Sequence, residues 1–183
     1  MKLEEMSIEE LWQLFPIFLV PHKDEWADWF EDERKEIISL IPDSIPLTVT
    51  HIGSTAVKDI AAKDIVDILI ETDSRDNMDI ICNILVQSGR ICMSKKENRI
   101  SLNKGYTENG FADRVFHYHL RLKGDNDEIY FRDYLNNHPE TAREYEKLKI
   151  ELWHRYEHNR DGYTDAKTDF VRLYTEKAKR GCR

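Results

Sequence analysis

The segments HIGST at residues 51–55 and AAKDIVDILIE at residues 61–71 decide the fold. The β-branched and apolar run at 47–52 predicts a strand that ends at the first segment. Residues 65–70 are almost continuously apolar, which predicts a second strand covered on both faces. Asp67 interrupts that strand. A buried carboxylate costs several kcal/mol unless it is paired, hydrogen-bonded or bound to a cation, so we expect a partner for Asp67.

The turn at Gly53, Ser54 and Thr55 has the composition of a phosphate-binding turn. Glycine lets a ligand approach the backbone closely. Successive backbone amides and two hydroxyl groups provide hydrogen-bond donors for a phosphate. The sequence therefore predicts an anion site beside Asp67.

A Gly-Ser turn, a spacer and an Asp in a hydrophobic strand resemble the signature of the nucleotidyltransferase superfamily, which has a polymerase-beta-like fold. More closely, residues 51–71 resemble the GrpB family, an uncharacterised group placed in that superfamily by its fold. The resemblance covers roughly residues 18–178. Its other segments follow in the family's order: Val20-Pro21-His22 with Glu25-Trp26, Arg114 with His117-Tyr118-His119, Phe131-Arg132-Asp133-Tyr134-Leu135 with His138-Pro139 and Arg143-Glu144-Tyr145, and Tyr163-Thr164-Asp165-Ala166-Lys167.

Length, charge and composition limit the kinds of protein this chain can be. With 183 residues, 40% of them hydrophobic, it is long enough for one core, and we expect a single domain over 1–183. The net charge of −8 argues against a general nucleic-acid surface. No run of about 18 apolar residues exists, and the N-terminus lacks a secretion signal. A soluble, cytoplasmic protein without membrane contact is expected, with its three cysteines as reduced thiols.

The remaining pattern predicts an α/β or α+β sheet. With the resemblance, we expect a nucleotidyltransferase-like α+β fold, a small mixed sheet flanked by helices. An N-terminal helical extension is expected over 1–17, with a helix at 7–15, and a helical C-terminal segment over 131–183. Further helices are expected at 24–41 and 74–88. The consecutive acids Glu31, Asp32 and Glu33 point around the first of these, which favours a solvated face over a metal site. Other expected features are short strands at 90–93 and 99–102, turns at 103–105 and 108–110, and a last helix from an N-cap at Thr164 to Lys179.

Residues 115–123 alternate cleanly between apolar and polar, which predicts a strand. His117 and His119 project to the same side of it, about 6–7 Å apart. From spacing alone, an exposed polar face and a functional site both stay open. The resemblance favours a site, because Arg114, His117 and His119 match an Arg-x-x-His-x-His pattern of the GrpB family.

The resemblance also implies metal chemistry. In the superfamily, two carboxylates two residues apart on one strand, with a third on a neighbouring strand, hold divalent metals that bind nucleotide phosphates. Here Leu69 stands at the position of the second carboxylate. Glu71 lies about 13 Å from Asp67 along a regular strand, which is too far for one shared ion. Mg²⁺ or Mn²⁺ is still the expected cofactor, with Asp67, His117 and His119 as ligands.

Three functional hypotheses follow, together with a structural alternative. The first is metal-dependent nucleotidyl or phosphoryl transfer on a nucleotide or another phosphate-containing small molecule. The second is a binding module that keeps the phosphate site without catalysis. The third is a two-histidine, one-carboxylate metal site for hydrolysis or oxygen chemistry. The structural alternative is a buried polar network of Asp67 with the histidines or Lys63.

The candidate residues of the first hypothesis have distinct roles, and whether the chain is an enzyme stays open. The expected catalytic residues are Asp67, His117 and His119, with the histidines replacing the missing carboxylates. The expected substrate-binding residues are Gly53, Ser54 and Thr55 at the turn, and Lys63, Arg114 and Lys167 as neutralising cations.

Overall fold

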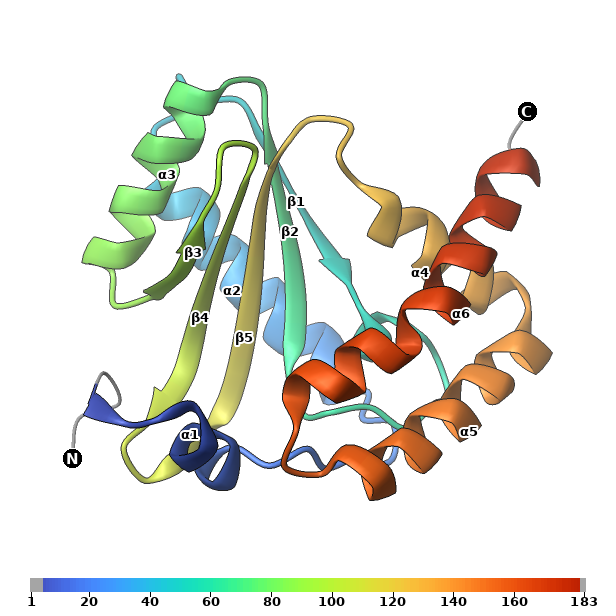
Figure 1. Ribbon diagram of the computed structural model, residues 1–183. Helices are drawn as coiled ribbons and strands as arrows, with labels where there is room; N and C mark the ends of the chain where they lie inside the picture. The colour runs from blue at the N-terminus through green and yellow to red at the C-terminus, as the bar shows by residue number, and fades with distance from the viewer. Residues whose placement is uncertain (1–4, 182–183) are drawn as a thin grey trace.

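A computed structural model describes residues 5–181 and places five strands in one mixed sheet (Figure 1). The spatial order is β1-β2-β5-β4-β3. The central pair β2 and β5 runs parallel, and the other three pairs are antiparallel. The strands are β1 (Leu47–Ile52), β2 (Val66–Thr72), β3 (Ile91–Lys95), β4 (Arg99–Thr107) and β5 (Gly110–Leu122). The predicted α+β class is confirmed.

Six α-helices are described, and five of them cover the two faces of the sheet. In Figure 1, α2 and α3 lie on one side of the strands, and α4, α5 and α6 lie on the other. Among residues 5–181, none of the helices has both the length and the apolar character that crossing a membrane requires. The helices are α1 (Ile8–Leu14), α2 (Glu25–Leu40), α3 (Arg75–Gln87), α4 (Asp127–Asn137), α5 (Pro139–Tyr156) and α6 (Arg160–Gly181).

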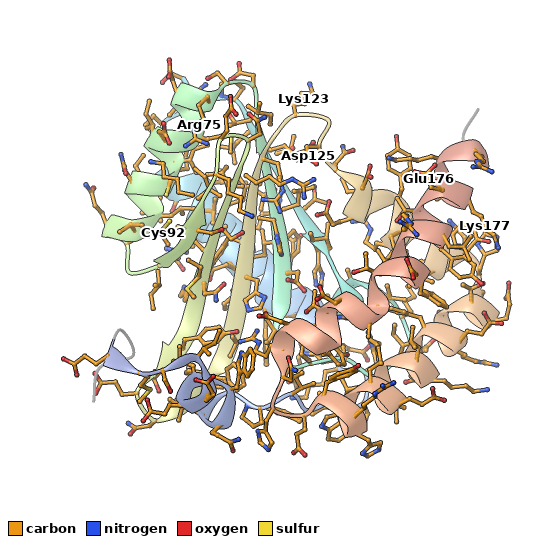
Figure 2. All side chains as sticks on the ribbon, viewed as in Figure 1. Arg75, Cys92, Lys123, Asp125, Glu176 and Lys177 are labelled. Carbon is orange, nitrogen blue, oxygen red and sulfur yellow. The ribbon has the colours of Figure 1, made fainter. Side chains whose placement is uncertain are left out.

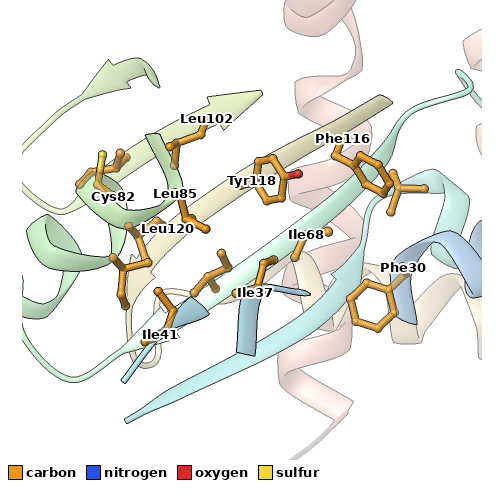
Figure 3. Close-up of a cluster of buried hydrophobic side chains, with 14 of the residues drawn as sticks. Phe30, Ile37, Ile41, Ile68, Cys82, Leu85, Leu102, Phe116, Tyr118 and Leu120 are labelled. Carbon is orange, nitrogen blue, oxygen red and sulfur yellow. The ribbon is translucent and has the colours of Figure 1, made fainter. Parts of the chain in front are cut away.

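The main core lies between the sheet and α2 and α3 (Figure 3). Alternate residues of β5 enter it, because successive side chains of a strand point to opposite faces. Phe116, Tyr118 and Leu120 are 3%, 0% and 0% exposed, so the alternation predicted for 115–123 is confirmed. Each such apolar side chain contributes about 1.5–3 kcal/mol when it is fully buried. This core fixes which side chains of β5 face the opposite side.

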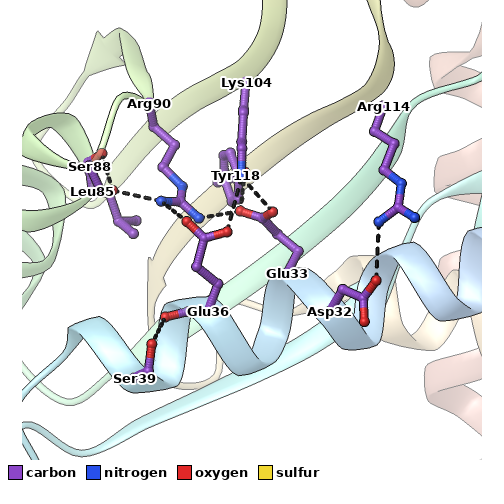
Figure 4. Close-up of polar contacts among 10 residues, drawn as sticks. All are labelled: Asp32, Glu33, Glu36, Ser39, Leu85, Ser88, Arg90, Lys104, Arg114 and Tyr118. Carbon is purple, nitrogen blue, oxygen red and sulfur yellow. Dashed lines mark hydrogen bonds and ion pairs between the residues drawn. The ribbon is translucent and has the colours of Figure 1, made fainter.

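A charged network is buried within the same face of the sheet (Figure 4). Glu33 of α2 is only 4% exposed; it pairs with Arg90 and, at 2.8 Å, with Lys104. The Tyr118 hydroxyl donates to Glu33 Oε1 at 2.6 Å. The predicted solvated acidic face is therefore wrong for Glu33. The sequence hides this because its partners come from distant strands and loops.

Two expected boundaries differ from the structure for reasons of close packing. The turn predicted at 103–105 is a bulge inside β4, where Gly105 has φ +92° and a Cβ would lie 2.4 Å from the Arg114 carbonyl oxygen. The last helix begins at Arg160 rather than after Thr164. Asn159 Oδ1 accepts from the Gly162 backbone N–H at 2.8 Å and caps this start. Glycine is tolerated there because it lies in the first turn.

Candidate functional site

On the face of the sheet opposite the main core, polar side chains of neighbouring strands lie side by side. Strand register aligns Asp67 of β2 with His117 of β5. The next residue on this face of β5 is His119, whose Nε2 lies 3.0 Å from Asp67 Oδ1. His117 Nδ1 lies 3.4 Å from the same oxygen. The partner expected for Asp67 is therefore the histidine pair, as the structural alternative proposed.

Gly53 occupies a position that only glycine fits. Its φ is +74°, which L side chains rarely adopt, and a Cβ there would lie 2.5 Å from Asp67 Oδ2. The chain then turns through the short 3₁₀ helix Ser54–Ala56. Thr55 Oγ1 lies 2.9 Å from His51 Nε2, which fixes the turn to the end of β1. Residues 51–55 and the strand that carries Asp67 thus meet in space.

A chain of hydrogen bonds supports His117 from behind. Arg160, at the start of α6, donates to the Tyr106 hydroxyl oxygen at 3.0 Å. That hydroxyl lies 2.7 Å from His117 Nε2. Because Tyr106 accepts from Arg160, its own proton is available to His117 Nε2. Nδ1 of His117 then carries the proton that faces Asp67.

His119 has a similar arrangement on its outer side. Arg121 is 5% exposed, and its Nη2 lies 3.4 Å from His119 Nδ1. A guanidinium can only donate, so Nδ1 accepts and Nε2 carries the proton toward Asp67. Both histidines therefore donate to one carboxylate oxygen.

Proton affinities in this cluster follow from those contacts. Burial raises the pKa of Asp67, but the hydrogen bonds from His117 and His119 outweigh it and hold the pKa well below its usual range. Burial lowers the pKa of His117, and the contact with Asp67 offsets only part of that effect. An ionised Asp67 beside a neutral His117 is the state these shifts favour.

A pocket of about 650 Å³ lies between this face of the sheet and helices α4, α5 and α6. It brings together most of the residues that the sequence singled out. Lining it are Gly53, Ser54, Thr55, Lys63, Asp67, His117, His119 and Lys167, joined by Tyr145, Lys149 and Tyr163.

Three lysines from separate segments converge at this pocket. Lys63 precedes β2, Lys149 lies on α5 and Lys167 lies on α6. Lys63 and Lys167 approach the Tyr163 ring to 5.6 Å and 4.2 Å from its centre. Lys149 is 2% exposed and donates to the Ala61 carbonyl oxygen. Within residues 5–181, none of the three forms an ion pair with a carboxylate.

The environment of these lysines favours loss of their protons in the free protein. Burial, together with the positive charges of Lys167 and Arg160, lowers the pKa of Lys63 to about 7. Burial and Lys167 lower the pKa of Lys149 to about 7, although Glu146 opposes the change. The pKa of Lys167 falls to about 8 from burial, although Asp67 opposes the change. A bound anion would reverse these shifts, because it favours the charged form.

Arg114 is the one predicted site residue that the structure places elsewhere. Its guanidinium pairs with Asp32 of α2 at 3.1 Å and lies 5.5 Å from the centre of the Trp29 ring. The ion pair lies on the α2 face of the sheet (Figure 4). Arg114 and His117 are three residues apart on one strand, so their side chains point to opposite faces.

The donor set does not fit the expected metal. Within residues 5–181, no group of three or more His, Cys, Asp or Glu side chains is arranged to hold a metal ion. Leu69 is fully buried at the second carboxylate position. Glu71 accepts instead from the Gly124 backbone N–H at 2.9 Å and from Asn126. His117 and His119 instead direct their ring N–H groups to Asp67 Oδ1.

Similar folds occur in solved structures. The chain matches a structure of Cid1 in complex with its short product ApU at a TM-score of 0.52 and 11% identity, over 81% of this chain and 45% of that one. A cytoplasmic RNA terminal U-transferase matches at 0.52 and 14% identity, over 81% and 45%. These likenesses define a nucleotidyltransferase-like fold.

Sequence comparison then gives the family. The family model described as GrpB protein matches residues 16–177, and the chain belongs to the GrpB family. It is 31% identical to the glutamate-rich protein GrpB of Alkalihalophilus pseudofirmus, over 85% of this chain and 91% of that protein. It is 30% identical to the UPF0157 protein YqkA of Bacillus subtilis over 96% of this chain, which spans only 51% of YqkA. A crystal structure of GrpB from Enterococcus faecalis matches with a TM-score of 0.77 at 24% identity, over 91% of this chain and all of that one.

Proposed function

We propose that this protein binds a nucleotide or another phosphate-containing small molecule in the pocket between the sheet and α4–α6. One observation carries the proposal: Lys63, Lys149 and Lys167 converge beside the Gly53–Thr55 turn without a carboxylate partner within residues 5–181. Gathering unpaired cations in a partly buried site is costly. An anionic ligand removes that cost, and the turn adds backbone amides and hydroxyls that donate to phosphate oxygens.

The size and walls of the pocket favour a ligand with an organic part. Its volume of about 650 Å³ is in the usual range for small-molecule sites, roughly 300–1,000 Å³. Phe131 and Leu135 of α4 and Val171 of α6 form apolar walls. Such walls suit the ring of a nucleoside or a comparable body, whereas inorganic phosphate would leave most of the pocket unfilled.

Nucleotidyl or phosphoryl transfer is a second candidate, favoured by the contact between Asp67 and the turn. A carboxylate whose Oδ2 faces Gly53 stands beside the place where a phosphate would sit. Asp67 would then accept a hydrogen bond from the hydroxyl that attacks the phosphorus and orient it, while His117 and His119 hold the carboxylate in place; pyrophosphate or a nucleoside diphosphate would be the leaving group. Incubation with radiolabelled nucleoside triphosphates tests this candidate. If the unaltered protein makes a labelled product and Asp67→Asn does not, the result supports transfer. If the protein binds the nucleotide but makes no product, only the binding function is supported.

Calorimetric titration with nucleoside mono-, di- and triphosphates tests the binding proposal. Lys167→Gln removes one of the three cations, and we expect the affinity to fall about tenfold or more, as for a lost charge-assisted hydrogen bond. Lys177→Gln is the matched control, because Lys177 is exposed on the same helix (Figure 2) and does not line the pocket. Equal affinity in both variants, or no binding by the unaltered protein, would contradict the proposal.

A further inference from the structure

The charge around the turn is unbalanced toward the positive side. Lys63, Lys149, Lys167 and Arg160 form a group of neighbouring cations, opposed by Asp67 at Lys63 and Lys167 and by Glu146 at Lys149. Four cations less two carboxylates leave a formal excess of two positive charges when all six groups are ionised. A phosphate monoester carries about 1.5–2 negative charges at neutral pH. The charge of one phosphate group therefore matches this excess without a metal ion.

The groups behind the histidines oppose a divalent metal at Asp67. A histidine that binds a metal usually donates its other ring N–H to a carboxylate or carbonyl. Here the outer nitrogen of His119 faces the buried guanidinium of Arg121, which can only donate. Turning His119 Nε2 into a metal ligand would place an N–H against that cation. Asp67 Oδ1 would also lose both of the hydrogen bonds that stabilise its charge.

On the basis of the proposed function, we infer that Lys63, Lys149 and Lys167 take the place of the metal ions, so that the pocket binds the phosphate group of its ligand as the free anion. The Gly53–Thr55 turn and the three ammonium groups then contact the phosphate oxygens directly. Asp67 does not contact the phosphates through a cation. It stays ionised between the two histidines and repels the ligand weakly. A phosphate chain already complexed with Mg²⁺ carries less charge and binds more weakly.

Inorganic tripolyphosphate, pyrophosphate and orthophosphate are suitable probes, because they test the phosphate subsite without a base or sugar. We expect calorimetry in EDTA to detect binding of these phosphate compounds without added metal. Replacing EDTA by excess Mg²⁺ should weaken tripolyphosphate binding at least about threefold. Lys63→Gln should weaken it about tenfold in EDTA.

Asp67→Asn gives the sharpest test because the two mechanisms predict opposite signs. Without a bridging metal, removing the negative charge strengthens tripolyphosphate binding by about threefold or more. With a bridging metal, the variant loses binding. The folded state of the variant is checked by thermal unfolding. Titration of the free protein with Mn²⁺ alone, followed by water proton relaxation, adds a readout that does not depend on the variant, and we expect no bound Mn²⁺.

The outcomes separate this inference from the proposed function. Binding that appears only with Mg²⁺ or Mn²⁺ and disappears in Asp67→Asn overturns the inference and leaves the phosphate-binding proposal standing. Binding of nucleotides without binding of tripolyphosphate also overturns the inference, because the phosphate chain would then not be the recognised group. Absence of binding by every phosphate compound, with and without metal, contradicts both.

Discussion

The two faces of the sheet both contain buried charged groups but treat them in opposite ways. On the α2 face, the Glu33 carboxylate is contacted by Arg90, Lys104 and the Tyr118 hydroxyl. On the pocket face, Lys149 is equally buried, yet it has a backbone carbonyl as its partner and no carboxylate within residues 5–181. A structural role requires a network in which each buried charge is paired, as on the α2 face. The lysines of the pocket face have no carboxylate ion pair within residues 5–181, as expected of a site that binds an anion. This contrast separates the functional face from the structural one.

Among substitutions that test this contrast, we expect the largest loss of stability on the α2 face. Glu33→Leu removes the buried carboxylate that Arg90 and Lys104 share and leaves them only the partly exposed Glu36. We expect the free energy of unfolding to fall by about 3–5 kcal/mol, measured by urea denaturation. Glu36→Gln is the control, because the Glu36 side chain is 44% exposed and also contacts Arg90, and its loss should cost less than about 1 kcal/mol. Similar losses in both variants would contradict the assignment.

Gly53→Ala tests the close contact at the pocket. The positive φ costs any other residue about 1–3 kcal/mol, and the new Cβ would also push Asp67 away from the turn. We expect a loss of about 2–3 kcal/mol in unfolding free energy and weaker phosphate binding. Gly89→Ala separates the two causes, since Gly89 has φ +95° and open space around it. If both variants bind phosphate as the unaltered protein does, the turn is not a phosphate site.

Lys149→Met tests the pocket face, where we expect a substitution to raise the stability of the protein and not to lower it. Removing an unpaired buried cation should raise the unfolding free energy by about 1–2 kcal/mol near pH 6.5. The pKa of Lys149 is lowered to about 7 in the folded protein, against about 10.4 when unfolded. Between those values the unfolded state binds more protons, so the stability of the unaltered protein rises with pH.

The advantage of Lys149→Met should therefore be greatest below pH 7 and shrink toward pH 10. Urea denaturation of both proteins at pH 6.5 and 9.5 measures it. A variant less stable than the unaltered protein at pH 6.5 would show that Lys149 already has a satisfactory partner in the free protein.

Tyr106→Phe has the smallest expected effect, because it removes one hydroxyl from the chain that joins Arg160 to His117. We expect a loss of about 1 kcal/mol in unfolding free energy. The specific readout is the nitrogen NMR spectrum of His117, in which the proton on Nδ1 should become less dominant. A spectrum unchanged by the substitution would mean that Asp67 alone fixes this tautomer.

Local pattern predicted the strands and the central carboxylate well. The apolar runs that became β1 and β2, and the alternation in β5, are short-range signals that burial enforces. They placed Asp67, His117 and His119 correctly, because side-chain direction in a strand depends only on position along it. Arg114 belongs to the same pattern, and counting alternate residues from His117 would have put it on the other face.

The parts of the site that sequence reasoning missed depend on how distant elements pack together. Lys149 gave a signal, since it interrupts the apolar stripe of α5 between Tyr145 and Leu152, but its place beside Lys63 depends on how α5 packs on the loop before β2. Tyr106 and Arg160 gave no signal in the sequence. Tyr106 lies on β4 and Arg160 at the start of α6, and the periodicity within either segment does not predict their contact.

The parallel pairing of β2 with β5 has a consequence for how the molecule is made. Asp67 and His119 meet across 52 positions of chain, and Lys149 reaches Ala61 across 88. Contacts this far apart form late, because long loops must close first. A nascent chain that has emerged only through β4 holds the Gly53 turn and Asp67 but no pocket, so a ligand can stabilise only chains that have folded completely.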